Sequence, residues 1–110
     1  MFRVVVHPQA KEDIARNANW WADHHSLDQA IAWVDAVDGQ LQSLEERPER
    51  FGVAEEDEQF PYEIRQMPVG VGSRRSHRAI YVIHEDEVLV LTVRRGDQDT
   101  VRVSELPKKF

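Results

Sequence analysis

Apolar residues along the chain follow two periods, one typical of helices and one typical of strands. In residues 9–24 they recur at spacings of four, four and three, at Ala10, Ile14, Ala18 and Trp21, which predicts an amphipathic helix. In residues 27–44 an unbroken spacing of three or four predicts a second helix. The apolar face predicted for that helix comprises Leu27, Ala30, Ile31, Val34, Val37, Leu41 and Leu44.

Local signals place the ends of both helices. His7-Pro8 stops a preceding β-branched run, and proline suits the first turn of a helix because it has no backbone N–H to leave unpaired. Ser26-Leu27-Asp28-Gln29 reads as a capping box that starts the second helix after the break at residues 24–25. The short break predicts an antiparallel helical hairpin.

Four β-rich stretches surround this hairpin. One precedes it, at residues 2–6, and three follow it, at residues 62–69, 76–84 and 88–95. A glycine-containing turn at residues 70–72 and a tight hairpin at residues 85–87 join the last three. The sequence therefore predicts an α+β fold of order β-α-α-β-β-β, in which the helical hairpin packs on a small, mainly antiparallel sheet.

Two segments lack a periodic pattern. Residues 45–61 are polar and acidic, with prolines at both ends, and we expect an exposed connection there. The tail at residues 97–110 has only a weak pattern, and we predict no element for it.

Length and composition limit the class of protein. A chain of 110 residues fits a single domain over residues 1–110, and it has no cysteine for a disulfide or a thiolate metal site. His24 and His25 are adjacent rather than four residues apart, so no metal or other cofactor is predicted. No apolar run is long enough for a signal peptide or a membrane span, and the expected location is the cytoplasm.

Charge is distributed unevenly along the chain. The net charge is −6, which taken alone argues against nucleic-acid binding. Residues 1–61 carry five Lys/Arg against thirteen Asp/Glu, whereas residues 62–110 carry nine against seven. The basic residues of the second half, mostly arginines, are therefore the place to look for a site.

The order of these elements resembles the RelE/ParE superfamily of toxins. The resemblance covers residues 2–96 and rests on loose motifs: Pro8-x-Ala10-x-x-Asp13-Ile14, Leu44-x-x-x-Pro48, Glu63-x-Arg65, the strand at residues 77–83 and the strand with its arginines at residues 88–96. It implies a toxin with a cognate antitoxin that wraps it. RelE-like members cleave messenger RNA on the ribosome, and ParE-like members poison DNA gyrase.

Three arginines are the leading candidates for a catalytic site. Arg78 lies at the start of one predicted strand, and Arg94 and Arg95 end the next, so antiparallel pairing brings them together. Strand alternation leaves at most one of the pair on the face of Arg78. The alternative interpretation is structural, with each arginine paired to an acidic neighbour such as Glu63 or Glu105.

Proton-transfer groups near these arginines are few. Cleavage of RNA by its own 2′-hydroxyl needs a base and an acid as well as cations. Glu63 and His77 are the candidates for proton transfer, although His77 equally suits simple packing at the start of its strand. Nuclease members of the superfamily usually carry a Tyr or His near the C-terminus, and none follows Arg95 here.

Further residues are candidates for binding. Arg65, Arg74 and Arg75 are candidates for contacting a target, since basic side chains extend a phosphate-binding surface, although such residues are more often simply solvated. Trp20, Trp21 and Trp33 are considered as an aromatic anchor for a partner, because aromatic residues dominate interface hot spots, and Trp21 and Trp33 are the candidates for contacting an antitoxin. An exposed tryptophan would be the first candidate. The alternative is that at least two of the three tryptophans seal the core.

Three functional hypotheses follow. The first is a ParE-like toxin that binds gyrase and is neutralised by its antitoxin. The second is a RelE-like, ribosome-dependent mRNA endonuclease that uses the arginines with Glu63 or His77. The third is a folded member of the family that has lost its toxicity.

Overall fold

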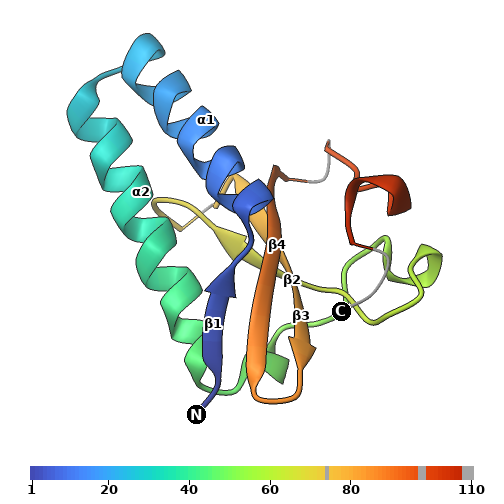
Figure 1. Ribbon diagram of the computed structural model, residues 1–110. Coiled ribbons are helices and arrows are strands. Elements are labelled where there is room, and N and C mark those ends of the chain that lie inside the picture. Colours follow the sequence, from blue (N-terminus) through green and yellow to red (C-terminus); the bar gives the residue numbers. More distant parts are fainter. Residues whose placement is uncertain (74, 97–98, 108–110) are drawn as a thin grey trace.

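A computed structural model gives the fold and describes residues 1–73, 75–96 and 99–107 (Figure 1). The α+β class and the order β-α-α-β-β-β are confirmed. The elements are β1 (Arg3–Val6), α1 (Pro8–His24), α2 (Leu27–Gln42), β2 (Arg65–Val69), β3 (His77–His84) and β4 (Glu87–Arg95), with short 3₁₀ turns at Ser43–Glu45, Pro48–Arg50, Asp57–Gln59 and Val103–Glu105.

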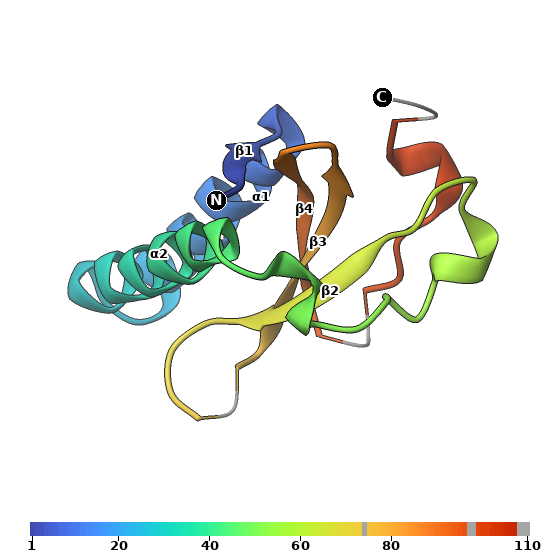
Figure 2. The ribbon, with the colours of Figure 1, turned by 90° about the horizontal axis from the view of Figure 1, so that it is seen from below.

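The four strands form one mixed sheet in the order β1-β4-β3-β2. β1 runs parallel to β4, and the other neighbours are antiparallel. The helical hairpin covers one face, while the segment between α2 and β2 and the C-terminal tail lie on the other side (Figure 2). A bulge in β4 places Leu91 opposite no partner, because Ile80 pairs with Thr92 and Tyr81 with Val90.

Local chemistry sets the ends of the elements largely as predicted. The Ser26 hydroxyl accepts a hydrogen bond from the Gln29 amide (3.1 Å), which confirms the N-cap. The reciprocal half of the capping box is replaced, because the Gln29 side chain accepts a bond from the Ser26 hydroxyl (3.2 Å). At the β2–β3 turn Gly70 has φ +132°, a conformation that only glycine adopts without strain.

The core on the helical face differs from the predicted apolar stripe of α2. Its buried side is formed by Ala30, Trp33, Val37 and Leu41, continued by Leu44 in the following turn. Leu27 and Ile31, which the sequence predicts to be buried, are 67% and 51% exposed. Leu27 and Ile31 lie on one side of this helix and Trp33 on another. The side with the large indole of Trp33 faces the sheet because it buries more apolar surface.

A second core lies on the other face of the sheet. Residues of β3 and β4 pack there against both segments that lack a periodic pattern; the cluster comprises Ala54, Phe60, Ile64, Ile80, Val82, Leu91, Val101 and Leu106. The prediction of a merely exposed connection at residues 45–61 is therefore wrong. The connection and the tail together close the sheet face that the helices leave open.

Candidate functional site

Strand register divides the predicted arginine cluster between two faces. Arg78 lies opposite Arg94, and His77 lies opposite Arg95. Since neighbouring residues of a strand point to opposite faces, Arg78 and Arg94 share the face of the second core. His77 and Arg95 share the helical face, as the strand alternation predicted for one of the two arginines.

Arg78 is a buried structural centre. Its Nε donates to the Gly96 carbonyl (2.9 Å) and its Nη1 to Glu56 (2.7 Å) and Gln66 (2.8 Å). Nη2 donates to the other oxygen of Glu56 and to the Asp99 carbonyl (3.1 Å). All five N–H donors of the guanidinium therefore have acceptors within the chain.

Glu56 is the carboxylate that pairs with Arg78. It lies in the connection at residues 45–61, which the sequence predicted to be exposed. Its carboxylate also accepts a bond from the Val101 amide (2.9 Å), and only 5% of the residue is exposed. The hydrogen bond from Arg78, opposed by burial, lowers the pKa of Glu56 to about 2. One buried ion pair thus joins the connection, the sheet and the tail.

Arg94 is also engaged within the chain. It donates to the Thr92 hydroxyl (2.9 Å) and the Asp99 carboxylate (3.2 Å), and it pairs with Glu105. The Glu105 contact is the structural alternative that the sequence offered. Arg94 therefore holds the tail on the sheet.

Two other predicted site residues lie in a surface ion pair. Glu63 and Arg65 are 2.9 Å apart, and Arg65 also donates to the carbonyls of Glu49 (3.2 Å) and Phe51 (2.5 Å). Arg65 thus fastens the connection to the start of β2. Glu63 faces this arginine, and no described contact joins it to Arg78 or Arg94.

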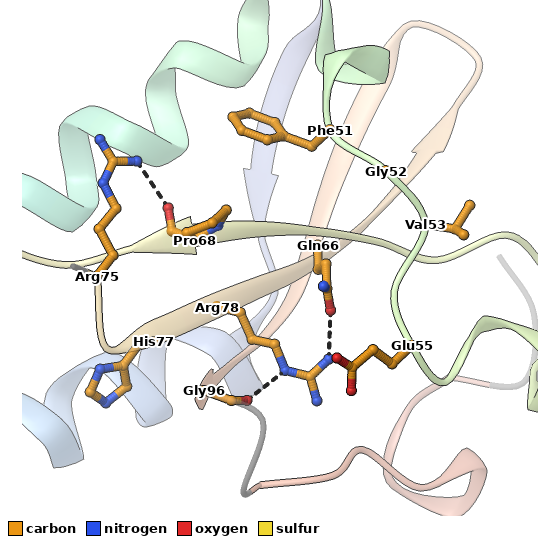
Figure 3. Close-up of a pocket in the computed structure, with 10 residues that line it drawn as sticks. All are labelled: Phe51, Gly52, Val53, Glu55, Gln66, Pro68, Arg75, His77, Arg78 and Gly96. Carbon is orange, nitrogen blue, oxygen red and sulfur yellow. Dashed lines mark hydrogen bonds between the residues drawn. The ribbon is translucent and has the colours of Figure 1, made fainter. Parts of the chain in front are cut away.

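A pocket of about 410 Å³ lies beside β2 (Figure 3). Arg75 and His77 line it, and Arg75 donates to the Pro68 carbonyl (3.0 Å). Figure 3 shows the Arg78 side chain turned to Gln66 and Gly96 rather than into open space. Arg74, the last predicted target-binding arginine, lies outside the described residues.

His77 is packed rather than poised for proton transfer. Its ring contacts Trp33 edge-on, with centroids 5.3 Å apart, and its Nδ1 lies 2.7 Å from the Ser76 hydroxyl. Burial and then the charge of Arg95 lower its pKa below the usual 6.5. The lowered pKa favours the neutral imidazole, which agrees with the packing interpretation.

The tryptophans occupy different environments. Trp33 is 1% exposed and belongs to the core, so the prediction that it contacts an antitoxin is wrong for the folded chain. Trp21 is half-buried against the same core, and Trp20 is 44% exposed. The sequence could not tell which of the three tryptophans would be exposed, because neighbouring helix positions of one residue type show no difference until the packed side of the helix is known.

Asp13 is a second buried charge that was not a predicted site residue. It accepts bonds from Gln9 (2.9 Å), Arg16 (2.7 Å), the Thr92 hydroxyl and the Val93 amide (3.1 Å). The one signal for it in the sequence is its place in the motif shared with the superfamily. Its donors lie on both α1 and β4, so the residue fastens the helix to the sheet.

Neither a metal centre nor a membrane segment is found in the part of the chain that the structure describes. Within those residues no three histidine or carboxylate side chains are grouped to hold a metal ion. The described helices also include none of the length and apolar character that crossing a bilayer requires.

Comparison with known proteins places the chain in a family. The family model described as "ParE toxin of type II toxin-antitoxin system, parDE" matches residues 4–100. A solved structure titled "Chromosomal ParDE TA system from P. aeruginosa" is similar with a TM-score of 0.72 at 16% identity, over 88% of this chain and 98% of that one. No curated protein matches the sequence. The match over residues 4–100 shows that this chain belongs to the ParE toxin family of type II toxin–antitoxin systems.

Proposed function

We propose that this ParE-family toxin arrests growth by binding DNA gyrase in the cytoplasm, without cutting RNA. The observation that supports this is the state of Arg78, whose five donors are all taken by the chain's own acceptors. A nuclease needs cations free to meet the phosphate charge in the transition state. Arg94 is likewise paired, and Arg95, which no described carboxylate pairs with, shares the helical face with His77, whose lowered pKa favours the neutral form over a proton donor.

Expression from an inducible promoter, without an antitoxin, tests this proposal. We expect growth arrest with an SOS response, and purified protein should inhibit supercoiling by gyrase. Messages mapped by primer extension should remain intact. Cleaved messages with normal supercoiling would instead identify a ribosome-dependent endonuclease, and unimpaired growth would identify a member that has lost its toxicity.

The choice of variants for this test depends on the buried ion pair. Arg78→Ala leaves Glu56 as an unpaired buried charge, which costs about 3–5 kcal/mol of folding free energy. Loss of toxicity in that variant therefore cannot separate unfolding from a lost site. Changes at exposed residues are needed to identify the surface that acts.

We further propose that a cognate ParD antitoxin neutralises the toxin by docking on the exposed side of the helical hairpin. Two apolar grooves of about 350 and 340 Å³ meet there at Val34. Their apolar lining comprises Ala18, Ala22, Leu27, Ala30, Ile31, Val34, Val6, Ile14, Ala15 and Leu41. Exposed leucine and isoleucine at a groove favour a partner that buries them.

Charge around these grooves indicates the chemistry of the docking segment. Asp35 borders one groove, Asp38 borders the other together with Lys11 of α1, and α2 itself carries no lysine or arginine. An amphipathic antitoxin helix with apolar residues at spacings of three and four, flanked by Lys or Arg, complements this surface.

Substitution of Ile31 by glutamate tests the docking surface. We expect Ile31→Glu to weaken antitoxin binding at least tenfold in calorimetry while growth arrest without antitoxin persists. Val71→Glu, at an equally exposed apolar residue of the β2–β3 turn, is the matched control and should bind normally. Unchanged affinity of the Ile31 variant would contradict docking on the hairpin.

A further inference from the structure

A small pocket on the helical face of the sheet shares no lining residue with the two apolar grooves of the hairpin. It measures about 260 Å³ and lies between α1 and the ends of β3 and β4. Arg16, Asn17 and Trp20 line it from α1, and His77 and Arg95 line it from the strands. It is smaller than the roughly 300–1,000 Å³ of typical small-molecule sites, which favours a single side chain as its occupant.

The cations of this pocket are available to a ligand. The Arg95 side chain is exposed, and among the described residues no hydrogen bond or ion pair engages it. The Arg16 side chain is 71% exposed and meets Asp13 through Nη2. The Nδ2 of Asn17 is buried and has no hydrogen-bond partner in the described part of the chain.

The carboxylates of the pocket wall are already compensated. Asp13 accepts four hydrogen bonds, including the one from Arg16. Asp99 lies 3.2 Å from the guanidinium of Arg94. Among the described residues, no carboxylate pairs with Arg95. Its positive charge is therefore the one left uncompensated in this pocket.

Trp20 provides an ordered apolar surface beside these cations. Its ring stacks on His24, with centroids 4.7 Å apart and planes 17° apart, and meets Trp21 edge-on at 5.5 Å. Neighbouring rings hold the indole in place, so binding costs little side-chain entropy. Tryptophan and arginine are also the residue types that dominate hot spots of protein interfaces.

We propose that this pocket is the contact point for the toxin's protein target and receives an Asp or Glu side chain between Arg95 and Arg16. An apolar residue next to that carboxylate in the target packs on Trp20. The inference rests on the proposed function, since it assumes an action through protein binding. It adds the surface and the chemistry of the recognised group.

A nucleic acid fits this surface less well than an acidic protein segment. A phosphate backbone is held by a row of cations, whereas this pocket offers two beside two carboxylates. Arg78, Arg94 and Arg65 are each engaged by an acidic partner. The net charge of −6 adds a general repulsion against a polyanion.

Charge reversal at Arg95 tests the proposal, with growth arrest, gyrase inhibition, antitoxin affinity and thermal unfolding as readouts. We expect Arg95→Glu and Trp20→Ala each to raise the concentration needed for gyrase inhibition at least tenfold and to relieve growth arrest. Arg95→Lys should retain most of the activity because it keeps the charge. Arg102→Glu, at an exposed arginine of the tail, is the control and should act like the wild type.

The outcomes separate this inference from the proposed function. A wild-type chain that arrests growth, together with an Arg95→Glu variant that arrests it equally, contradicts the pocket and leaves the toxin function standing. A wild-type chain without toxicity contradicts both. If Arg95→Glu loses antitoxin binding but keeps its toxicity, the pocket belongs to the antitoxin interface and the inference is wrong.

Discussion

The buried carboxylate of Asp13 accepts hydrogen bonds at the end of β4, on the side where no described strand is present to accept them. β1 ends at Val6, which pairs with Val90, and beyond this point β4 has no neighbour on that side. The carboxylate of Asp13 takes up the Val93 amide and the Thr92 hydroxyl there. A buried amide without an acceptor costs about 1–3 kcal/mol, so the helix residue is part of the sheet's hydrogen bonding.

Replacement of Asp13 by alanine should therefore lower the free energy of unfolding by about 2–3 kcal/mol, since two buried donors of β4 lose their acceptor. Chemical denaturation measures the change. Glu12→Ala, at the exposed neighbouring position, should stay within about 0.5 kcal/mol of the wild type. Equal effects of the two substitutions would show that the Asp13 contacts contribute nothing to stability.

At the scale of elements, the connection between α2 and β2 and the C-terminal tail act as one cover for the sheet. Glu56 comes from the connection, the Val101 amide from the tail, and both meet at Arg78. Tyr62 adds a hydrogen bond to the Pro107 carbonyl. The two segments are therefore expected to unfold together.

The ion pair of Glu56 should make the free energy of unfolding depend on pH between about 4.5 and 2. The pKa of Glu56 is lowered from 4.5 to about 2 in the folded chain, so its contribution is complete above about pH 4.5 and is lost as the pH falls towards 2. We expect Glu56→Gln to cost about 3 kcal/mol at pH 7, because it leaves Arg78 without its counter-charge. The difference from the wild type should shrink towards zero near pH 2.

Denaturation curves measured at several pH values check this expectation, with Glu55→Gln as the control. Glu55 is exposed and adjacent in sequence, so its variant should follow the wild-type pH profile. A constant difference between the wild type and the Glu56 variant from pH 7 to pH 2 would contradict the role of the ionised pair.

The sequence predicts those elements whose signal is local. Helix and strand periods place all six elements to within a few residues, because spacing and caps act over single turns. The second core leaves no such signal, since Ala54, Phe60 and Val101 lie far apart in the sequence and follow no period. Arg78 cannot be classified from the sequence for the same reason, because its partner Glu56 lies 22 residues away in an acidic run.

At the scale of the molecule, the acidic first half and the more basic second half of the sequence contribute differently to the structure. Several arginines of the second half bind the chain's own acidic residues and hold the far face of the sheet together. The helical hairpin keeps its excess of carboxylates at the surface. Under the two proposals made above, the apolar grooves of the hairpin would bind the antitoxin and the pocket at Arg95 would bind the target.

The parallel pairing of β1 with β4 has a consequence for synthesis of the toxin. Arg3 pairs with Glu87 and Val6 with Val90, so β1 finds its neighbour only when a strand 84 residues further along the chain has been made. Contacts between residues so distant in sequence also slow folding, because a long loop must close first. The complete sheet, including the β4 end that carries Arg95, therefore forms only after β4 has been synthesised, and a chain that stops before β4 lacks it.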